Sequence, residues 1–176
     1  MTQAAASTTP VNKEKSHVQG PTPCLVFANR AEEAINFYVS LFDNSRVVSA
    51  VRSDGKGPIP AGALMHAIFE LDGRRYTTFD GGPNFSFTDG FSLMVTCDAQ
   101  DEIDRLWTSL TADGGEEGPC GWLKDRFGLS WQVVPADLGQ MLSDSAHGNT
   151  GKAAEAMFKM KKLDIATLRQ AYGSGS

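Results

Sequence analysis

The strongest constraint on the fold of this chain is an internal repeat with a spacing of 69 residues. An apolar run over residues 24–28 is followed by apolar side chains spaced as on one face of a helix: Ala34, Ile35, Tyr38, Leu41 and Phe42. The same order returns as an apolar run over 91–97 and a second helical stripe, formed by Ile103, Leu106, Trp107 and Leu110. The chain therefore contains two copies of one structural unit.

Each copy also shows a helix start and further strands. Asn29 and Asp98 stand where a side chain caps a helix, and each has an acid three residues later. Strand-like segments follow the first helix at 45–52, 63–71 and 74–79, and the second at 115–120, 121–126 and 129–134. Each unit thus has the order βαβββ. A single unit would leave one sheet face exposed, so we expect the two to pair, within one chain or between chains.

Four segments follow from these patterns. Residues 1–20 are poor in apolar side chains and predict a flexible tail without the apolar core of a secretory signal. Residues 21–135 hold the paired βαβββ units, and 136–172 show helical patterns that predict a C-terminal helical extension. Residues 173–176 have the composition of a flexible linker.

Charge and cysteine content exclude several classes of protein. The formal net charge of −5 argues against a nucleic-acid partner, and no apolar run reaches the roughly 18 residues needed to span a membrane. Three widely spaced cysteines predict neither a disulfide framework nor a zinc ribbon. We therefore expect a reduced, cytoplasmic protein with neither a nucleic-acid nor a membrane partner.

Longer strings of the sequence resemble one protein family. The strings lie at 29–38, 69–73, 81–83, 114–118, 120–125 (Cys-Gly-Trp-Leu-Lys-Asp), 131–135 (Trp-Gln-Val-Val-Pro) and 160–165. They resemble the PhnB-like branch of the glyoxalase/bleomycin-resistance superfamily, also called vicinal oxygen chelate (VOC), often labelled 3-demethylubiquinone-9 3-methyltransferase. The resemblance implies an α+β fold in which two βαβββ modules form a cup-shaped mixed sheet, and a homodimer. Methyl transfer does not fit the residues, because no Gly-rich loop follows the run at 24–28.

The resemblance also directs attention to the metal site of the superfamily. Its ligands lie on the first and last strand of each unit, which correspond here to positions 22–23, 91–92, 79–80 and 131–132. Among these residues, Asp80 is a strong ligand type and Gln132 a weak one, and such a set does not hold zinc or iron(II) firmly. We therefore expect no metal and no other cofactor, and keep a divalent metal bound through Asp80 and Gln132 as the weaker alternative.

Two titratable residues are the candidate catalytic pair. His66 lies on a predicted strand, and Asp80 ends the next strand, where the family pattern has a small or β-branched residue and an asparagine, respectively. A carboxyl group in an apolar cup has a raised pKa, which suits proton transfer near neutral pH. We predict Asp80 as base and His66 as its partner. The alternative is structural: His66 forms an ordinary hydrogen bond and Asp80 caps a turn.

The last strands of the second unit carry the candidate ligand contacts. The predicted substrate-binding residues are Trp122, Trp131, Gln132, Cys120 and Ser92. The two tryptophans would form flat walls for an aromatic molecule, and Gln132 offers both a donor and an acceptor. The alternative is that the tryptophans belong to the core and that Cys120 is an inert thiol.

These observations leave two classes of function open. The leading prediction is a metal-independent protein that acts on a small aromatic or oxygenated molecule by proton transfer, as an isomerase or lyase does. The alternative is a non-catalytic protein that binds and sequesters a small molecule, as bleomycin-resistance proteins do. A titratable pair inside the cup would favour the enzyme, and a pocket of aromatic and amide groups would favour the binder.

Overall fold

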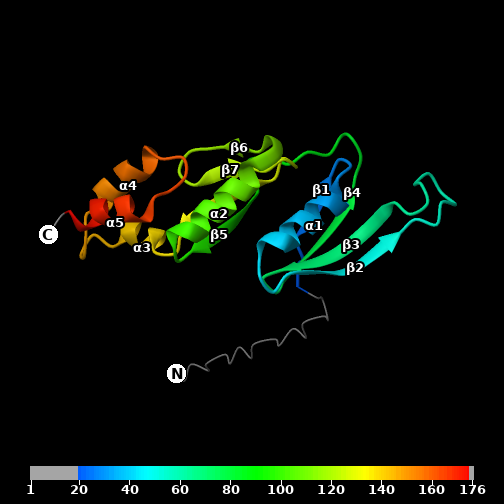
Figure 1. The fold of residues 1–176 in the computed structure, drawn as a ribbon, viewed down its shortest axis with the longest axis horizontal. Helices are drawn as coiled ribbons and strands as arrows, with labels where there is room; N and C mark the ends of the chain where they lie inside the picture. Colours follow the sequence, from blue (N-terminus) through cyan, green and yellow to red (C-terminus); the bar gives the residue numbers. More distant parts are fainter. Residues whose placement is uncertain (1–19, 175–176) are drawn as a thin grey trace, which may run out of the picture.

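A computed structural model describes residues 20–174, which form two βαβββ modules and a C-terminal group of helices (Figure 1). The first module consists of β1 (Cys24–Phe27), α1 (Ala31–Leu41), β2 (Arg46–Arg52), β3 (Leu64–Leu71) and β4 (Arg74–Asp80). The second consists of β5 (Ser92–Cys97), α2 (Gln100–Thr111), the 3-10 turn η1 (Ala112–Gly114), β6 (Glu116–Glu117), β7 (Trp122–Lys124) and β8 (Ser130–Pro135). The predicted fold class and the repeat are confirmed.

The two sheets have the same topology. Their strand orders are β1-β4-β3-β2 and β5-β8-β7-β6, with the first and last strand of each module paired in parallel and the other pairs antiparallel. The sheets are therefore mixed. β1 and β5 are edge strands, so each module leaves the edge of its first strand without a partner in the same sheet.

Each sheet packs one face against its own helix and leaves the other face open. In β3, Ala67 and Phe69 are fully buried on the helix side, whereas His66 and Ile68 alternate with them and lie on the open side. In β5, Cys97 is buried on the helix side and Met94 lies on the open side. We call these two uncovered surfaces the open faces of the modules.

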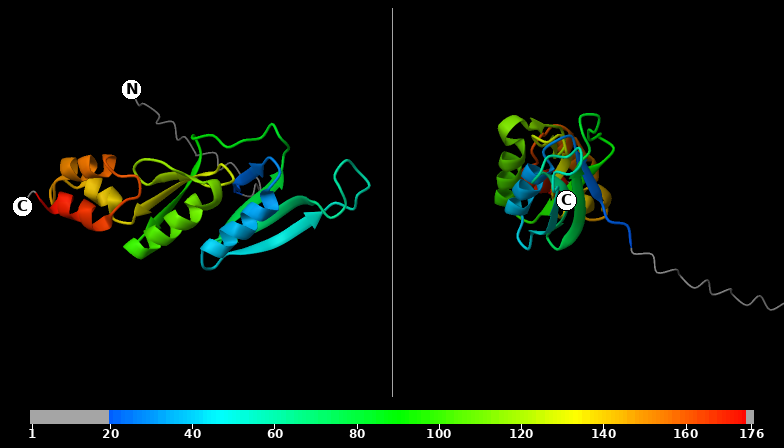
Figure 2. Two further views of the ribbon diagram at one scale, coloured as in Figure 1. Left: turned by 45° about the horizontal axis from the view of Figure 1, so that its top comes forward. Right: turned by 90° about the vertical axis from the view of Figure 1, so that its right-hand side faces the viewer.

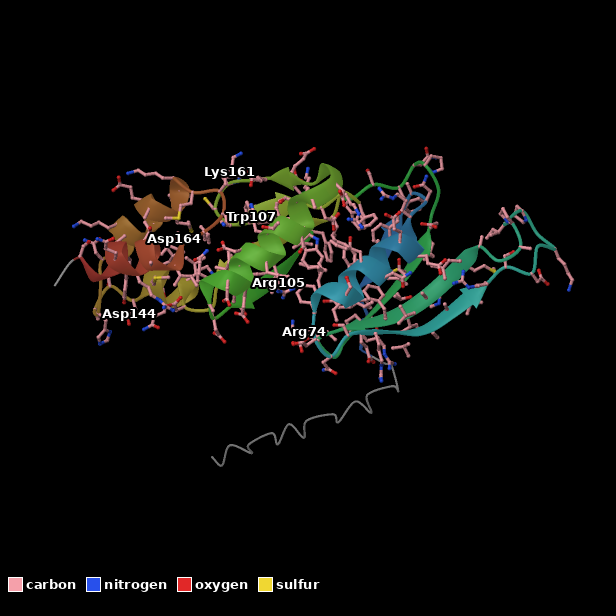
Figure 3. All side chains as sticks on the ribbon, in the orientation of Figure 1. Arg74, Arg105, Trp107, Asp144, Lys161 and Asp164 are labelled. Atoms are coloured by element: carbon pink, nitrogen blue, oxygen red, sulfur yellow. The ribbon has the colours of Figure 1, made fainter. Side chains whose placement is uncertain are left out.

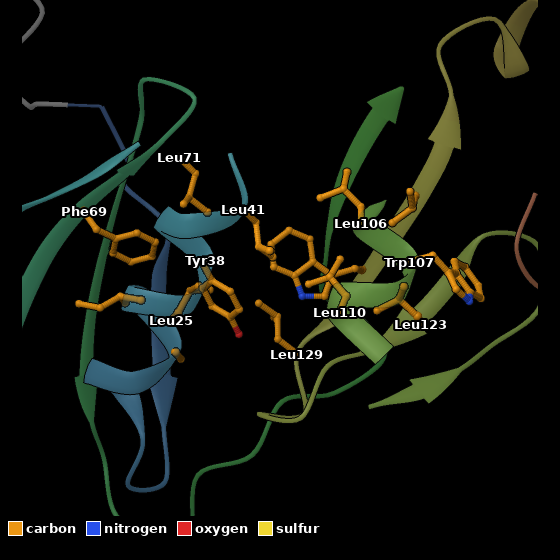
Figure 4. Packing of buried hydrophobic residues seen from close by; sticks show 14 of the residues in the cluster. Leu25, Tyr38, Leu41, Phe69, Leu71, Leu106, Trp107, Leu110, Leu123 and Leu129 are labelled. Atoms are coloured by element: carbon orange, nitrogen blue, oxygen red, sulfur yellow. The ribbon is translucent and has the colours of Figure 1, made fainter. Parts of the chain in front are cut away.

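The modules contact each other through their helix sides (Figure 4). Tyr38 and Leu41 of α1 belong to one buried cluster with Leu129 and Trp131 of the second module. This contact covers neither open face: Val51 and Met94, which lie on the open faces of the first and second module, are 53% and 62% exposed.

The helix starts differ from the sequence-based prediction. Residue 30, rather than Asn29, is the N-cap of α1 and makes no capping hydrogen bond with its side chain. At α2 the Glu102 carboxylate accepts the backbone N–H groups of Asp98 and Ala99, so Asp98 contributes a backbone donor instead of capping with its side chain. The N–H group of Ala31 in α1 donates to the carboxylate of Asp80, which is 49 positions away in the sequence. No local pattern could reveal this contact.

The C-terminal helices α3 (Leu138–Ser143), α4 (Thr150–Phe158) and α5 (Ile165–Gly173) lie at the end of the second module that is far from the first (Figure 2). They enclose a second buried cluster formed by Val134, Met141, Ala153, Leu163 and Leu168. Gln100 at the start of α2 ties them down, because its side chain donates to Leu163 O (3.1 Å) and accepts from Ile165 N (2.9 Å).

The predicted terminal tails can be compared with the structure only in part. Residues 1–19 and 175–176 lie outside the described residues, so the predicted flexible tail over 1–20 is not described except for Gly20. Gly173, assigned to a linker from its composition, is the last residue of α5. Within residues 20–174, no helix has the length and apolar character needed to cross a membrane.

Candidate functional site

The open face of the first module carries a histidine–threonine pair. His66 Nε2 is hydrogen-bonded to Thr77 Oγ1, and Thr77 Oγ1 also donates to the Ala67 carbonyl at 3.2 Å. Val51 lies opposite His66 on β2, and Ile68 lies opposite Thr77. The imidazole therefore lies among apolar side chains, is half-buried, and reaches the surface that no helix covers.

Asp80 lies on the other side of the same sheet. Its position on β4 is three residues from Thr77, so the alternation of a strand directs the two side chains to opposite faces. Asp80 Oδ1 accepts the N–H group of Ala31 at 2.8 Å, at the first residue of α1. The structure thus does not bring Asp80 and His66 together. Asp80 instead accepts a hydrogen bond from an amide at the start of α1 that has no partner within the helix, and its negative charge interacts favourably with the helix dipole.

The open face of the second module brings together three of the predicted ligand contacts. Gln132 Nε2 donates to Ser92 Oγ at 2.9 Å, and Trp122 pairs in register with Gln132 on the neighbouring strand. A hollow of about 370 Å³ lies beside Trp122; its lining includes Ser130, Lys124 and the acidic residues Asp89, Glu116 and Glu117, but neither Ser92 nor Gln132. Beside it, Trp122, Ser92 and Gln132 offer a flat aromatic surface, a hydroxyl and an amide, none of which carries a charge.

Trp131 and Cys120 are placed elsewhere. Trp131 alternates with Gln132 and therefore lies on the helix side, where it is 1% exposed and stacks on Phe42 at a ring distance of 5.9 Å. It lies within the core, as the alternative prediction has it. Cys120 occupies a tight turn with φ of 58°, and its backbone N–H donates to Met160 O at 2.8 Å. The Cys120 backbone therefore binds the C-terminal helical region to the second module.

The sequence suggested only that Asp125 closes a hairpin; in the structure it is 3% exposed and lies at the junction of the modules. Its carboxylate accepts the Tyr38 hydroxyl (2.7 Å), Trp131 Nε1 (2.8 Å) and the backbone N–H groups of Phe127 (2.8 Å) and Leu129 (3.1 Å). Burial, followed by the charge of Asp125, raises the pKa of Tyr38 well above its ordinary value, so the hydroxyl stays protonated and donates. The signal in the sequence was its place at the end of the string at 120–125 that resembles the family.

Cationic side chains surround this junction. The Arg126 guanidinium lies over the rings of Phe37 (4.2 Å) and Phe127 (5.0 Å), and Arg30 lies over Phe127 at 4.6 Å. On the other side, Arg105 of α2 donates to Leu41 O at the end of α1 (3.0 Å), and it faces the first module in Figure 3. These contacts fix one module against the other.

A groove of about 530 Å³ runs along the junction, with all six residues of β5 in its lining. Arg74, Arg105, Asp43, Asp72 and Glu102 contribute charges of both signs to it. Cys97 lies at the end of β5, and burial raises the pKa of its thiol to about 11. The groove therefore has neither a clear charge preference nor a reactive thiolate.

The residues at the superfamily's metal positions do not fit a metal ion. Within residues 20–174, no group of three or more His, Cys, Asp or Glu side chains is placed to hold one. Asp80 is engaged at the start of α1, and the Gln132 amide is engaged with Ser92. The donor set is thus too weak and too dispersed for a divalent ion.

Comparison with known proteins gives a consistent result. The model of the family described as 3-demethylubiquinone-9 3-methyltransferase matches residues 19–134. A solved structure from Bacillus cereus, described as a putative 3-demethylubiquinone-9 3-methyltransferase, PhnB protein, is 41% identical. The match covers 67% of this chain and 100% of that one, with a TM-score of 0.61. No curated protein matches the chain.

A second structure shows the same fold at lower identity. Protein PA1353 from Pseudomonas aeruginosa is 23% identical, with 67% of this chain and 98% of that chain covered and a TM-score of 0.55. The family match ends at residue 134, so α3, α4 and α5 lie beyond it. Because the chain folds into two βαβββ modules and the family match spans most of it, the protein belongs to the PhnB-like family, within the glyoxalase/bleomycin-resistance (VOC) superfamily.

Proposed function

We propose that this protein binds a small, uncharged aromatic or oxygenated molecule against the open faces of its modules. The observation that carries this proposal is the composition of those faces: the Ser92–Gln132 pair and Trp122 on one, and the His66–Thr77 pair among apolar residues on the other. A few convergent polar groups on an apolar surface are typical of small-molecule sites.

A second copy of the chain would complete the site. Within one chain the modules meet on their helix sides, so each open face lacks a facing wall. Exposed apolar residues on or beside these faces, including Val51, Phe91 and Met94, would gain cover in a homodimer. We infer a homodimer in which the open face of one copy's first module faces that of the other copy's second module.

Binding is better supported than a two-residue proton-transfer mechanism. The predicted base, Asp80, holds the start of α1, and its side chain points away from the face that carries His66. Proton transfer remains the second candidate function, with His66 as the acting group, because His66 is the one histidine on an open face within the described residues.

Methyl transfer and metal-dependent chemistry are not part of the proposal. The chain has no Gly-rich loop between β1 and α1 that could hold a nucleotide-like methyl donor. The hydrogen bonds of Asp80 with Ala31 and of Gln132 with Ser92 argue against a metal held by these two residues. We place the protein in the cytoplasm, where an exposed thiol such as Cys24 stays reduced.

Thermal unfolding with a panel of small aromatic and oxygenated molecules tests the proposal. A ligand at 100 times its Kd adds about 2.7 kcal/mol of stability, which raises the Tm of a chain of this size by about 5–10 °C. The variant Gln132→Ala should lose most of that shift, whereas the matched control Gln170→Ala, on an exposed site of α5, should keep it. Equal shifts in both variants would refute a site at Gln132.

Light scattering on the purified protein tests the dimer. We expect twice the chain mass, and Met94→Lys should give the monomer, because it places a charge on the open face. A wild-type monomer that still binds the ligand would contradict the inferred dimer and show that one open face is enough for binding.

A further inference from the structure

The hydrogen bonds of Thr77 determine which nitrogen of His66 carries the proton. A threonine hydroxyl has one hydrogen to donate, and Thr77 Oγ1 lies 3.2 Å from the Ala67 carbonyl oxygen, which can only accept. Both contacts are hydrogen bonds only when the oxygen accepts from His66 Nε2–H, so this arrangement has Nε2 as the protonated nitrogen. This is an assignment from the hydrogen-bond network, and it leaves Nδ1 as the nitrogen with a lone pair.

The neighbours of His66 leave Nδ1 available. Among residues 20–174, Nδ1 of His66 has no hydrogen-bond partner, and the side chain opposite it on β2 is Val51. Glu70 lies on the same face, four residues further along β3, and its carboxylate forms ion pairs with Arg46 and Arg75. The open face of the first module thus presents one hydrogen-bond acceptor among apolar side chains.

We propose that His66 Nδ1 is the acceptor that selects the ligand, that Thr77 is the positioning residue that holds this tautomer, and that the ligand carries a phenolic or enolic hydroxyl. An acceptor in apolar surroundings discriminates in favour of a donor, because a ligand without one leaves the nitrogen unpaired and desolvated. The hydroxyl-bearing ring would lie against Val51 and Ile68. The ligand class rests on the proposed function; the tautomer does not.

Nitrogen-15 NMR of the ligand-free protein tests the tautomer. Above about pH 8 an ordinary histidine with a pKa near 6.5 is neutral, and its two ring nitrogens then give distinct shifts. We expect the Nε2–H form for His66, assigned by comparison with His66→Gln, with His147→Gln as the matched control. Thr77→Ser should keep the Nε2–H form and Thr77→Val should lose the preference. An Nδ1–H form in the wild type would overturn the assignment.

Binding of 2-naphthol and 2-methoxynaphthalene tests the ligand class. In the second compound a methyl group replaces the hydroxyl hydrogen and removes the donor, so we expect 2-naphthol to bind about three- to tenfold more tightly, the range of one neutral hydrogen bond. His66→Phe, which has no acceptor, and Thr77→Val should remove that preference, and His147→Gln should keep it. Equal affinities in the wild type would overturn the selection by His66 while leaving small-molecule binding intact. Binding of neither compound, when other members of the panel bind, would overturn the hydroxyl assignment alone.

Discussion

Replacing Asp125 with alanine removes the buried group that joins the two modules. The carboxylate accepts four hydrogen bonds, two from the aromatic side chains of Tyr38 and Trp131 and two from backbone amides of its own hairpin. Tyr38 belongs to the first module and the other partners to the second, so one residue connects α1 with β8. The substitution tests whether this connection stabilises the fold.

The expected cost follows from the donors left without a partner. A hydrogen bond to a charged group contributes about 1.5–3 kcal/mol, and a buried donor that loses its acceptor pays its own desolvation. Removing the buried carboxylate also relieves its desolvation, which offsets part of the loss. We expect Asp125→Ala to lower the free energy of unfolding by about 3–5 kcal/mol, and Tyr38→Phe, which removes one donor, to lower it by about 1–2 kcal/mol.

Urea unfolding followed by circular dichroism measures both values. In the Asp125→Ala background the Tyr38 hydroxyl has no acceptor, so Tyr38→Phe should cost nearly nothing there, giving a coupling of at least about 1 kcal/mol. Asp89→Ala serves as a matched control, because Asp89 pairs with Lys124 at the surface and its loss should change stability little. A loss below about 1 kcal/mol for Asp125→Ala, or equal costs of Tyr38→Phe in both backgrounds, would refute the reasoning.

Three further predictions follow from single groups. Asp80→Ala should destabilise the protein by about 1 kcal/mol through the start of α1, whereas Asp80→Asn keeps an acceptor and should change thermal stability little. At pH 8, iodoacetamide should modify exposed Cys24 well before Cys97, whose pKa of about 11 reduces its thiolate about 100-fold relative to a thiol at 9.0. The raised pKa values of Cys97 and Tyr38 mean that the folded state holds more protons than the unfolded state above about pH 9, so urea midpoints should fall as the pH rises beyond that value.

Most of the fold could be predicted because its main signals are local. The apolar stripes of α1 and α2 and the runs that became β1 and β5 are set by side-chain periodicity, which the sequence displays directly. The helix starts could not be predicted, because the N–H group of Ala31 is bound by Asp80 from another strand. A cap supplied across 49 residues leaves no pattern at the helix itself.

The candidate site was predicted less well, since it depends on which face of a strand each side chain takes. Ser92 and Gln132 do meet on an open face, as expected of residues on two strands that pair in parallel. Trp131, one position from Gln132, lies in the core instead. The sequence contains both residues but not the register of β8 against α2, and a shift of one residue exchanges their roles.

The same alternation decides what chemistry the first module can perform. Thr77 and Asp80 both lie on β4, yet an odd separation of three residues sends Thr77 to the open face with His66 and Asp80 to the helix side. An aspartate on the open face would give His66 an ionised acceptor for its N–H group. A threonine accepts one hydrogen bond from a neutral imidazole and leaves the other nitrogen as an acceptor. The strand register therefore makes the first module a surface suited to a hydroxyl donor.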